Sequence, residues 1–227
     1  MSSATRRRDR TKRKNLGQAG EVKLVTAVNS MEALDTLAVL VDQKTRTFAR
    51  HGIRNLFGLP GYLDFFQDIA GNSSARDLVH VSKLQAGTNT VATNLGLVYG
   101  DRYYHVLASY TDSDLSRWGP GAAHLNDLLC YAIERGLKIF DFTIGDERYK
   151  RDWCNEAQPL YDHVTATSWR GTFIVVPMVA LQKLRRTIKQ TPILWAGVGK
   201  IRGVMGALRR GGKVAVAAPR GTGDPRT

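Results

Sequence analysis

The stretch between Gly119 and Trp153 constrains the fold more than any other part of this chain. It opens on Gly119-Pro120-Gly121, continues with apolar residues at helical spacing up to Gly136, and then carries the mainly apolar segment 137–142. The residues at helical spacing are Leu125, Leu128, Leu129, Ala132 and Ile133. The pattern predicts a turn, a helix over residues 122–135 and a short buried strand. This order brings a helix N-terminus close to the end of a strand, where proteins commonly bind phosphate groups.

The region before this stretch changes from a helical to an alternating pattern. It predicts helices over residues 30–52, capped by Asn29 or Ser30, and 62–70, followed by strands at 79–84, 90–99 and 102–110. The first helix is expected to bury the face formed by Met31, Leu34, Ala38, Val41 and Phe48. The three strands are expected to form an antiparallel meander, with the strand 137–142 close to them in the same sheet. The fold class is therefore α+β, a mixed and mainly antiparallel sheet flanked by helices.

Beyond Trp153 the pattern is weaker. It predicts strands at 163–168 and 172–176, a helix at 180–189, and a basic amphipathic stretch at 193–210. We therefore divide the chain into a basic N-terminal segment (1–20), one domain (21–177) and a basic, helical, amphipathic C-terminal tail (178–227).

The net charge of +13 is carried by the two ends of the chain. Residues 1–14 have a net charge of +6 and residues 182–227 of +10, whereas residues 15–181 have a net charge of −3. A nearly neutral body argues against nucleic acid as the main partner. The N-terminal run is expected to be solvated and either mobile or helical. The tail is expected either to contact an anionic membrane surface weakly or to pack on the domain.

Bulk features also bear on the location of the protein and on metal binding. The longest apolar run, 173–181, is far shorter than the roughly 20 residues of a membrane-spanning helix. No apolar stretch follows the N-terminal charges, so they do not form a secretory signal. The two cysteines, Cys130 and Cys154, are not spaced as metal ligands. We expect a cytoplasmic protein, free or peripheral at the inner membrane surface, without a metal site.

The turn before the predicted helix has the residues of an anion-binding site. Gly119 and Gly121 would let a ligand approach the backbone amides that run on to Ala122, and Pro120 suits the first helical position. A pyrophosphate would fit such a turn. The same residues also suit an ordinary turn that starts a helix.

Polar residues after the strand 137–142 are candidates for acid–base chemistry. Asp141 is either a general base or the hydrogen-bond acceptor of a turn. Tyr149 could protonate a leaving thiolate, and Lys150 could neutralise an anion. His105 is a further acid–base candidate, because its strand leads to Asp112 and the same region.

The run from Val79 to Trp153 resembles the GNAT-like acyltransferase domain of the CelD type, which is associated with cellulose and exopolysaccharide synthesis and related to FemAB peptidyltransferases. The resemblance rests on Gly87, Tyr110-Thr111-Asp112, Gly119-Pro120-Gly121, Gly136, Phe140-Asp141-Phe142, Gly145, Tyr149-Lys150 and Trp153. It implies a GNAT-like fold and an N- or O-acyltransferase that uses acetyl-CoA or another acyl-CoA. The expected transfer is of acetyl to an amine or hydroxyl of an envelope- or polysaccharide-related acceptor.

Roles for single residues follow from their chemistry together with the resemblance, which carries over no invariant catalytic base. The catalytic candidates are Asp141, Tyr149 and His105; the coenzyme-binding candidates are Arg117, Gly119, Gly121 and Ala122; the acceptor-binding candidates are Asp112, Lys150 and Trp153. The pyrophosphate signature of the wider fold, Gln/Arg-x-x-Gly-x-Gly/Ala, has Ser116 in its leading position here. Relatives usually carry another GNAT-like half before this one. The alternative is therefore a non-catalytic half-domain or scaffold that needs a partner GNAT-like half or forms a homodimer.

Overall fold

The computed structural model describes residues 3–145, 147–161 and 163–190. The chain divides into two compact units, residues 1–157 and 158–227, and each is described by itself. The division lies before the predicted boundary at residue 177.

The first unit is built on a five-stranded sheet with the strand order β1-β2-β3-β4-β5. The strands are β1 (Val22–Thr26), β2 (Val79–Ala86), β3 (Asn89–Tyr99), β4 (Arg102–Tyr110) and β5 (Ile139–Asp141). Neighbours from β1 to β4 are antiparallel, and β5 is parallel to β4. The predicted meander is confirmed, the strand predicted at 137–142 lies in the same sheet beside it, and the fold class is mixed α+β with a mainly antiparallel sheet. Strand β1 lies outside the predicted strands.

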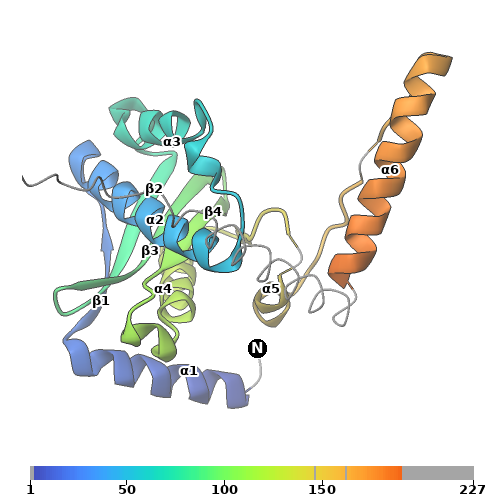
Figure 1. The fold of residues 1–227 in the computed structure, drawn as a ribbon. Helices are drawn as coiled ribbons and strands as arrows, with labels where there is room; N and C mark the ends of the chain where they lie inside the picture. Colours follow the sequence, from blue (N-terminus) through green and yellow to red (C-terminus); the bar gives the residue numbers. More distant parts are fainter. Residues whose placement is uncertain (1–2, 146, 162, 191–227) are drawn as a thin grey trace, which may run out of the picture. The chain divides into compact units, whose positions relative to one another are not determined.

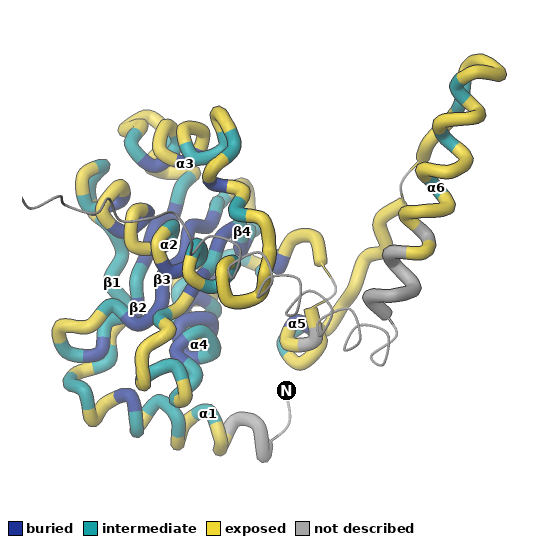
Figure 2. The backbone as a smooth tube through the Cα atoms, in the orientation of Figure 1, coloured by how far each residue is buried: buried dark blue, intermediate teal, exposed yellow. Residues whose placement is uncertain are grey.

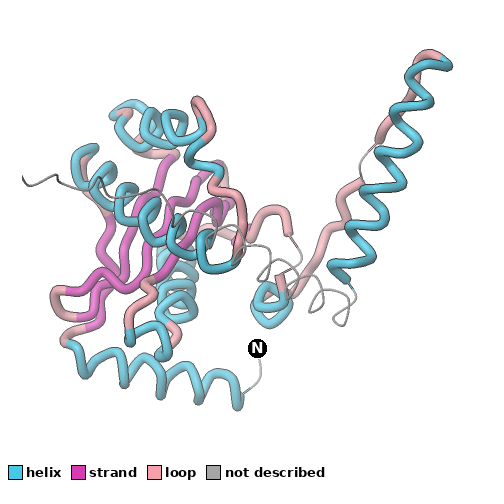
Figure 3. Tube along the Cα trace, in the orientation of Figure 1, coloured by secondary structure: helices cyan, strands magenta, loops and turns pink. Residues whose placement is uncertain are grey.

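Helices cover both faces of this sheet (Figures 1 and 3). The described helices are α1 (Ser3–Leu16), α2 (Ser30–His51), α3 (Tyr62–Gly71), α4 (Pro120–Glu134), α5 (Arg148–Trp153) and α6 (Trp169–Gln190), with short 3-10 turns at Gly17–Ala19, Leu56–Gly58, Ser73–Ala75 and Asp114–Trp118. Helices α2 and α3 pack on one face around Leu37, Leu95 and Leu107. On the other face α4 packs on Tyr103 through Leu128. The central strands are consequently the most buried part of the unit (Figure 2).

Helix α2 begins and ends where the sequence predicts, but it buries a different face. The side chain of Asn29 accepts a hydrogen bond from Glu32 N (2.8 Å), and Gly52 ends the helix in the left-handed conformation. The predicted face is confirmed only in part, because Met31 (71%) and Leu34 (37%) are exposed, whereas Val41 and Phe48 pack against the core. The buried residues are Ala33, Thr36, Leu37, Leu40 and Gln43. Gln43 explains the rotation, because its side chain bonds to Thr93 (2.8 Å) on the sheet and so fixes which side of α2 faces inward.

The basic N-terminal segment is a helix that belongs to the first unit. Its last residue, Leu16, is fully buried among residues of β2, β3 and α4. Arg13 forms an ion pair with Asp127 of α4 (2.9 Å) and donates to the carbonyl of Val22 (3.3 Å). One face of this helix therefore packs on the domain instead of being solvated.

The described part of the second unit contains α6 and no strand. The strands predicted at 163–168 and 172–176 are wrong, since residues 169–176 are helical and residues 163–168 form no ladder. A helix satisfies its own backbone groups, whereas an isolated apolar β-branched run such as Ile174-Val175-Val176 needs a strand partner. The helix predicted at 180–189 lies inside α6. The amphipathic stretch 193–210 lies outside the described residues, and none of the described helices is long and apolar enough to cross a membrane.

Two hairpin glycines allow a matched test of how closely the chain packs at the start of β1. Gly87 and Gly100 have φ of 61° and 60°, but only at Gly87 would a side chain collide with backbone, at the carbonyl of Ala19 and at Gly20. We expect Gly100→Ala to lower the free energy of unfolding by about 1 kcal/mol through the left-handed conformation alone. Gly87→Ala should cost about 1–3 kcal/mol more because of the overlap. Urea unfolding followed by circular dichroism measures both, and equal losses would contradict the close approach.

Candidate functional site

The predicted anion-binding turn forms as a left-handed glycine followed by the first turn of α4. Gly119 has φ of 60° and caps the helix, and Pro120 is its first residue. The carbonyl of Gly119 accepts from the amides of Ala122 (3.1 Å) and Ala123 (3.2 Å). The amide of Ala122 is therefore already used within the helix. Gly121, one residue earlier, lies in the first turn, where helix geometry offers its amide no carbonyl.

Both glycines of this turn face neighbouring side chains. A side chain at Gly121 would meet the ring of Tyr110 at 3.3 Å, and one at Gly119 would meet the Lys12 side chain at 3.3 Å. Lys12 comes from α1, which packs across the start of α4. Arg117 is exposed beside the turn and stacks on Trp118. The turn thus combines a helix N-terminus with two cations, which favours an anionic ligand.

Strand β4 continues beyond its pairing with β5. The two strands pair only at Arg102, Tyr103 and Tyr104, and no other described strand lies on that side of β4. We call residues 105–110 the β4 edge. Thr111 N donates to Val91 O (2.9 Å), and because bonded pairs alternate in an antiparallel ladder, the backbone groups of Ala108 and Tyr110 point away from β3. This edge leads directly to the turn at Gly119.

Four charged or titratable residues lie close enough beside the β4 edge to influence one another's pKa: Lys44, His105, Glu147 and Lys150. Lys44 reaches from α2 and donates through Nζ to the carbonyl of Ala108 (2.9 Å). Burial lowers the pKa of Lys44, although nearby Glu147 acts in the opposite direction. The cluster joins helix α2, strand β4 and the segment after β5.

Glu147 is the more exposed of the two carboxylates described in the segment 141–150. Its Oε2 lies 2.9 Å from Lys150 Nζ. Partial burial alone would raise the pKa of Glu147, but the hydrogen bond from Lys150 and the charges of Lys150 and Lys44 lower it overall. Glu147 is therefore ionised at neutral pH.

Lys150 is buried and holds this segment together. Besides its ion pair with Glu147, its Nζ donates to the carbonyl of Ile144 (3.0 Å). The predicted acceptor-binding lysine is therefore engaged within its own segment. Trp153, the last residue of α5, is half-buried three residues further on.

Asp141 and Tyr149 have different surroundings. The carboxylate of Asp141 accepts from Arg102 (2.9 Å) and from the amide of Thr143 (2.7 Å), so both of its oxygens are engaged. Tyr149 is 45% exposed, and its ring packs edge-on against Phe142. Burial and the charge of Glu147 raise the pKa of Tyr149, which keeps its phenol protonated at neutral pH.

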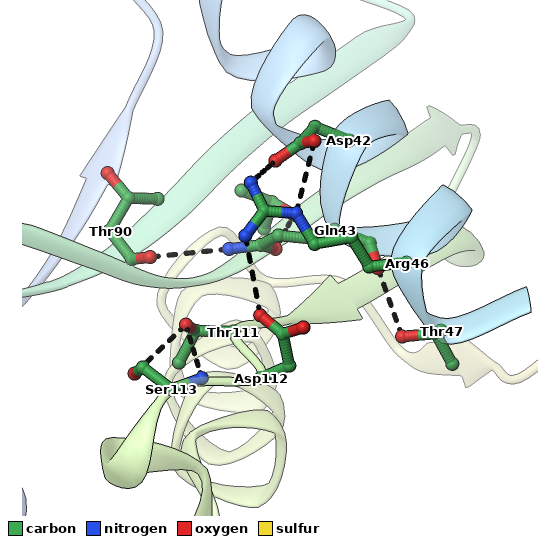
Figure 4. A network of polar contacts seen from close by, with 9 residues as sticks. Asp42, Gln43, Arg46, Thr47, Thr90, Thr111, Asp112 and Ser113 are labelled. Atoms are coloured by element: carbon green, nitrogen blue, oxygen red, sulfur yellow. Dashed lines mark hydrogen bonds and ion pairs between the residues drawn. The ribbon is translucent and has the colours of Figure 1, made fainter. Parts of the chain in front are cut away.

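Asp112 lies at the other end of the β4 edge (Figure 4). Arg46 of α2 bridges Asp42 (2.6 Å) and Asp112 (3.5 Å). Gln43, on the same helix, donates to the carbonyl of Thr90 (3.2 Å). The contact of Arg46 ties α2 to the loop that precedes the glycine turn, and the contact of Gln43 ties it to β3.

The structure brings Lys12, Lys44 and Glu147 into the site, although the sequence did not single them out as site residues. Lys12 and Lys44 are far from Gly119 and Ala108 along the chain, and neither lies in a local motif. Glu147 lies in the polar segment that the sequence identified. It is three residues before Lys150, and this spacing was the signal in the sequence that could have indicated their ion pair.

Comparison with known families assigns the fold. Residues 3–151, about two thirds of the chain, match the family model of the acetyltransferase (GNAT) domain. The chain belongs to the GNAT acetyltransferase family. Members use acetyl-CoA, so the glycine turn and the β4 edge of this GNAT domain are candidates for coenzyme contacts. Among the residues the structure describes, no group of three or more His, Cys, Asp or Glu side chains is placed to hold a metal ion.

Solved acetyltransferase structures are similar to the GNAT domain at low identity. An aminoglycoside acetyltransferase from an uncultured soil metagenomic sample, in complex with sisomicin, is 14% identical with a TM-score of 0.46, covering 64% of this chain and 97% of its own. A predicted acetyltransferase of Clostridium acetobutylicum with acetyl-CoA is 12% identical with a TM-score of 0.46, covering 63% and 96%. No curated protein matches the sequence. The family assignment rests on the match over residues 3–151.

Three buried histidines should make the stability of the GNAT domain depend on pH. Burial, reinforced by nearby charges or histidines, lowers the pKa of His80 and His105 to about 4 and that of His124 to about 3. The unfolded chain protonates near pH 6.5, so between pH 6.5 and about 4 it binds protons that the folded chain does not. We expect the free energy of unfolding to fall by roughly 1 kcal/mol per buried histidine between pH 7 and 5.5.

Urea unfolding at several pH values checks this expectation. His124→Gln should weaken the pH dependence, whereas His51→Gln, at the exposed end of α2, should leave it unchanged. The same slope in wild type and His124→Gln would show that His124 is not held neutral.

Proposed function

We propose that the chain is an acetyl-CoA-dependent N- or O-acetyltransferase of the CelD type, related to FemAB peptidyltransferases, with an envelope- or polysaccharide-related acceptor. The observation that carries the proposal is the position of the β4 edge. It runs from the cluster of Lys44, His105, Glu147 and Lys150 to the glycine turn at Gly119. One extended ligand could therefore place phosphates at the turn and a reactive group near the cluster. Acetyl-CoA has this form.

The proposed contacts of the coenzyme follow from its chemistry. Its diphosphate carries negative charge, which suits the amide of Gly121 and the cations Lys12 and Arg117. Its pantetheine arm contains two amides, which can pair with the outward-facing backbone groups of Ala108 and Tyr110 as an added strand would. Of these two outward carbonyls, that of Ala108 accepts a hydrogen bond from Lys44. That of Tyr110 accepts none from a described side chain.

The proposed reaction forms one bond to the acetyl carbon and breaks its bond to sulfur. The acceptor amine or hydroxyl attacks the thioester carbonyl and loses a proton, and the coenzyme leaves as a thiolate that takes up a proton. Glu147 is the carboxylate best suited to receive the first proton, directly or through water, because it is ionised and exposed. Tyr149 suits the second step as a protonated phenol. Asp141, with both oxygens engaged, would hold Arg102 and the turn at Thr143.

The acceptor and the location belong to the same proposal. The resemblance to the CelD type supports an acceptor on a polysaccharide or envelope component. The proposed location is cytoplasmic, with the C-terminal part at the inner membrane surface; the exposed apolar residues of α6, among them Phe173, Ile174 and Leu181, support only the membrane contact.

Coenzyme binding can be tested together with the role of Lys12. Isothermal titration calorimetry should detect acetyl-CoA binding to the wild type, and release of free thiol in the presence of an amine or hydroxyl acceptor should report transfer. Lys12→Glu should weaken acetyl-CoA binding about tenfold, because it replaces a cation with an anion at the turn. Lys23→Glu, an exposed charge change on β1, is the matched control and should bind normally. Absence of acetyl-CoA binding at millimolar concentration would overturn the proposed function.

The two carboxylates can be separated by their kinetics. Glu147→Gln should lower kcat by about 10²-fold with little change in the KM for acetyl-CoA, because only proton removal is affected. Asp141→Asn should lower mainly the free energy of unfolding, because it weakens the ion pair with Arg102. Steady-state kinetics and urea unfolding of both variants check this. A large loss of kcat in Asp141→Asn together with a nearly normal kcat in Glu147→Gln would instead indicate that Asp141 is the general base.

A further inference from the structure

A line of hydrogen-bonded side chains crosses the sheet on its α4 face and ends at His105. Its members, in order, are Thr26 of β1, His80 of β2, Tyr103 of β4, Asn94 of β3 and His105 of β4. Thr26 Oγ1 lies 3.1 Å from His80 Nε2, and His80 Nδ1 lies 2.9 Å from the Tyr103 hydroxyl. Asn94 then bridges Tyr103 (2.7 Å) and His105 Nδ1 (2.8 Å). The line therefore reaches from the far edge strand to the β4 edge.

The backbone around Asn94 fixes the orientation of its amide. One end of the side chain lies 3.2 Å from the amide nitrogen of Gly96, which can only donate. The other end lies 3.2 Å from the carbonyl oxygen of Leu107, which can only accept. The oxygen of Asn94 must therefore face Gly96 and Tyr103, and its NH₂ group must face Leu107 and His105.

This orientation fixes the direction of every proton in the line. The NH₂ group of Asn94 only donates, so Nδ1 of His105 is the acceptor and the proton of the neutral ring lies on Nε2. The oxygen of Asn94 only accepts, so the Tyr103 hydroxyl donates to it and accepts from His80 Nδ1. His80 Nε2 in turn accepts from the hydroxyl of Thr26. Each group donates toward His105.

The surroundings exclude competing partners and disfavour charge. Asn94 and Tyr103 are fully buried, and His80 is stacked on Tyr131 of α4 at 4.0 Å. The His105 ring contacts Phe140 and Phe142, which come from β5 and the segment after it. Burial, with the cations Lys150 and Lys44, lowers the pKa of His105 to about 4, so the ring is neutral at pH 7.

We infer that His105 is a fixed hydrogen-bond donor through Nε2–H, positioned by Asn94, and not the general base of the site. In the reaction proposed above, on which this role rests, the acceptor of that hydrogen bond is the carbonyl oxygen of the thioester, which gains negative charge as the substrate attacks. Asn94, Tyr103, His80 and Thr26 are positioning residues that act through His105. A base at this position would need an unprotonated nitrogen facing the reactants, and the line leaves none.

The tautomer can be measured without any ligand. Long-range ¹H–¹⁵N correlation spectra of protein labelled with ¹⁵N-histidine should show His105 neutral at pH 7, with the proton on Nε2. Asn94→Asp replaces the donor with an acceptor and should move the proton to Nδ1, whereas Asn126→Asp, on the exposed side of α4, should leave the spectrum of His105 unchanged. A charged ring, or a proton on Nδ1 in the wild type, would overturn the inference.

Kinetics distinguish a donor from a base even if Asn94→Asp does not fold. The side-chain amide of glutamine can place an N–H near the position of Nε2, whereas the shorter asparagine reaches only that of Nδ1. We expect His105→Gln to keep kcat within about threefold and His105→Asn to lose about 10²-fold, the usual cost of a lost oxyanion donor. Equal, large losses in both folded variants would indicate a base and overturn the donor role. Failure of acetyl-CoA to bind the wild type would overturn the proposed function but leave the tautomer standing.

Discussion

The parallel pairing between β4 and β5 is only three residues long, and the organisation of the site depends on where it stops. An ion pair joins Arg102, at the first paired position of β4, to Asp141, at the last paired position of β5, and Phe140 stacks on Tyr103 at 4.9 Å. After Asp141 the chain turns at Thr143, whose φ of 58° is rare for a β-branched residue. Hydrogen bonds from Thr143 to Asp141 and to the carbonyl of His105 hold that conformation. The rest of β4 consequently has no strand on the side opposite β3 among the described residues.

The β4 edge acquires its chemistry from elements that are distant in the sequence. Lys44 extends from α2 to a carbonyl of the edge, and α1 brings Lys12 alongside Gly119 at the far end. Both helices are held by contacts outside the site: Gln43 anchors α2 to Thr93, and Arg13 anchors α1 to Asp127. The charges that would meet a coenzyme are therefore positioned by the packing of the sheet and its covering helices.

Local signals in the sequence predicted much of this fold. The Asn29 cap, the Gly52 stop and the turn at Gly119 depend on neighbouring residues, and each formed where the pattern placed it. The inward face of α2 was predicted only in part: Val41 and Phe48 pack on the core, but the fully buried side carries Leu37, Leu40 and the polar contact of Gln43 and leaves Met31 exposed. The strands predicted after residue 160 were wrong because β-branched residues favour a strand only where a partner strand exists, and no partner strand is described there.

The same distinction applies to the candidate site, where the sequence indicates which residues are chemically able but not which of their atoms are free to act. His105 and Asp141 are recognisable as chemically able side chains, but what each can do depends on which of its atoms are already occupied. Gly96 illustrates this dependence, because any side chain there would overlap the ring of Tyr103 and prevent it from reaching Asn94. A buried polar line is stable only when every member is satisfied. The bulge that separates Leu95 from Gly96 therefore helps to set the tautomer of a histidine ring, through backbone geometry that no residue pattern displays.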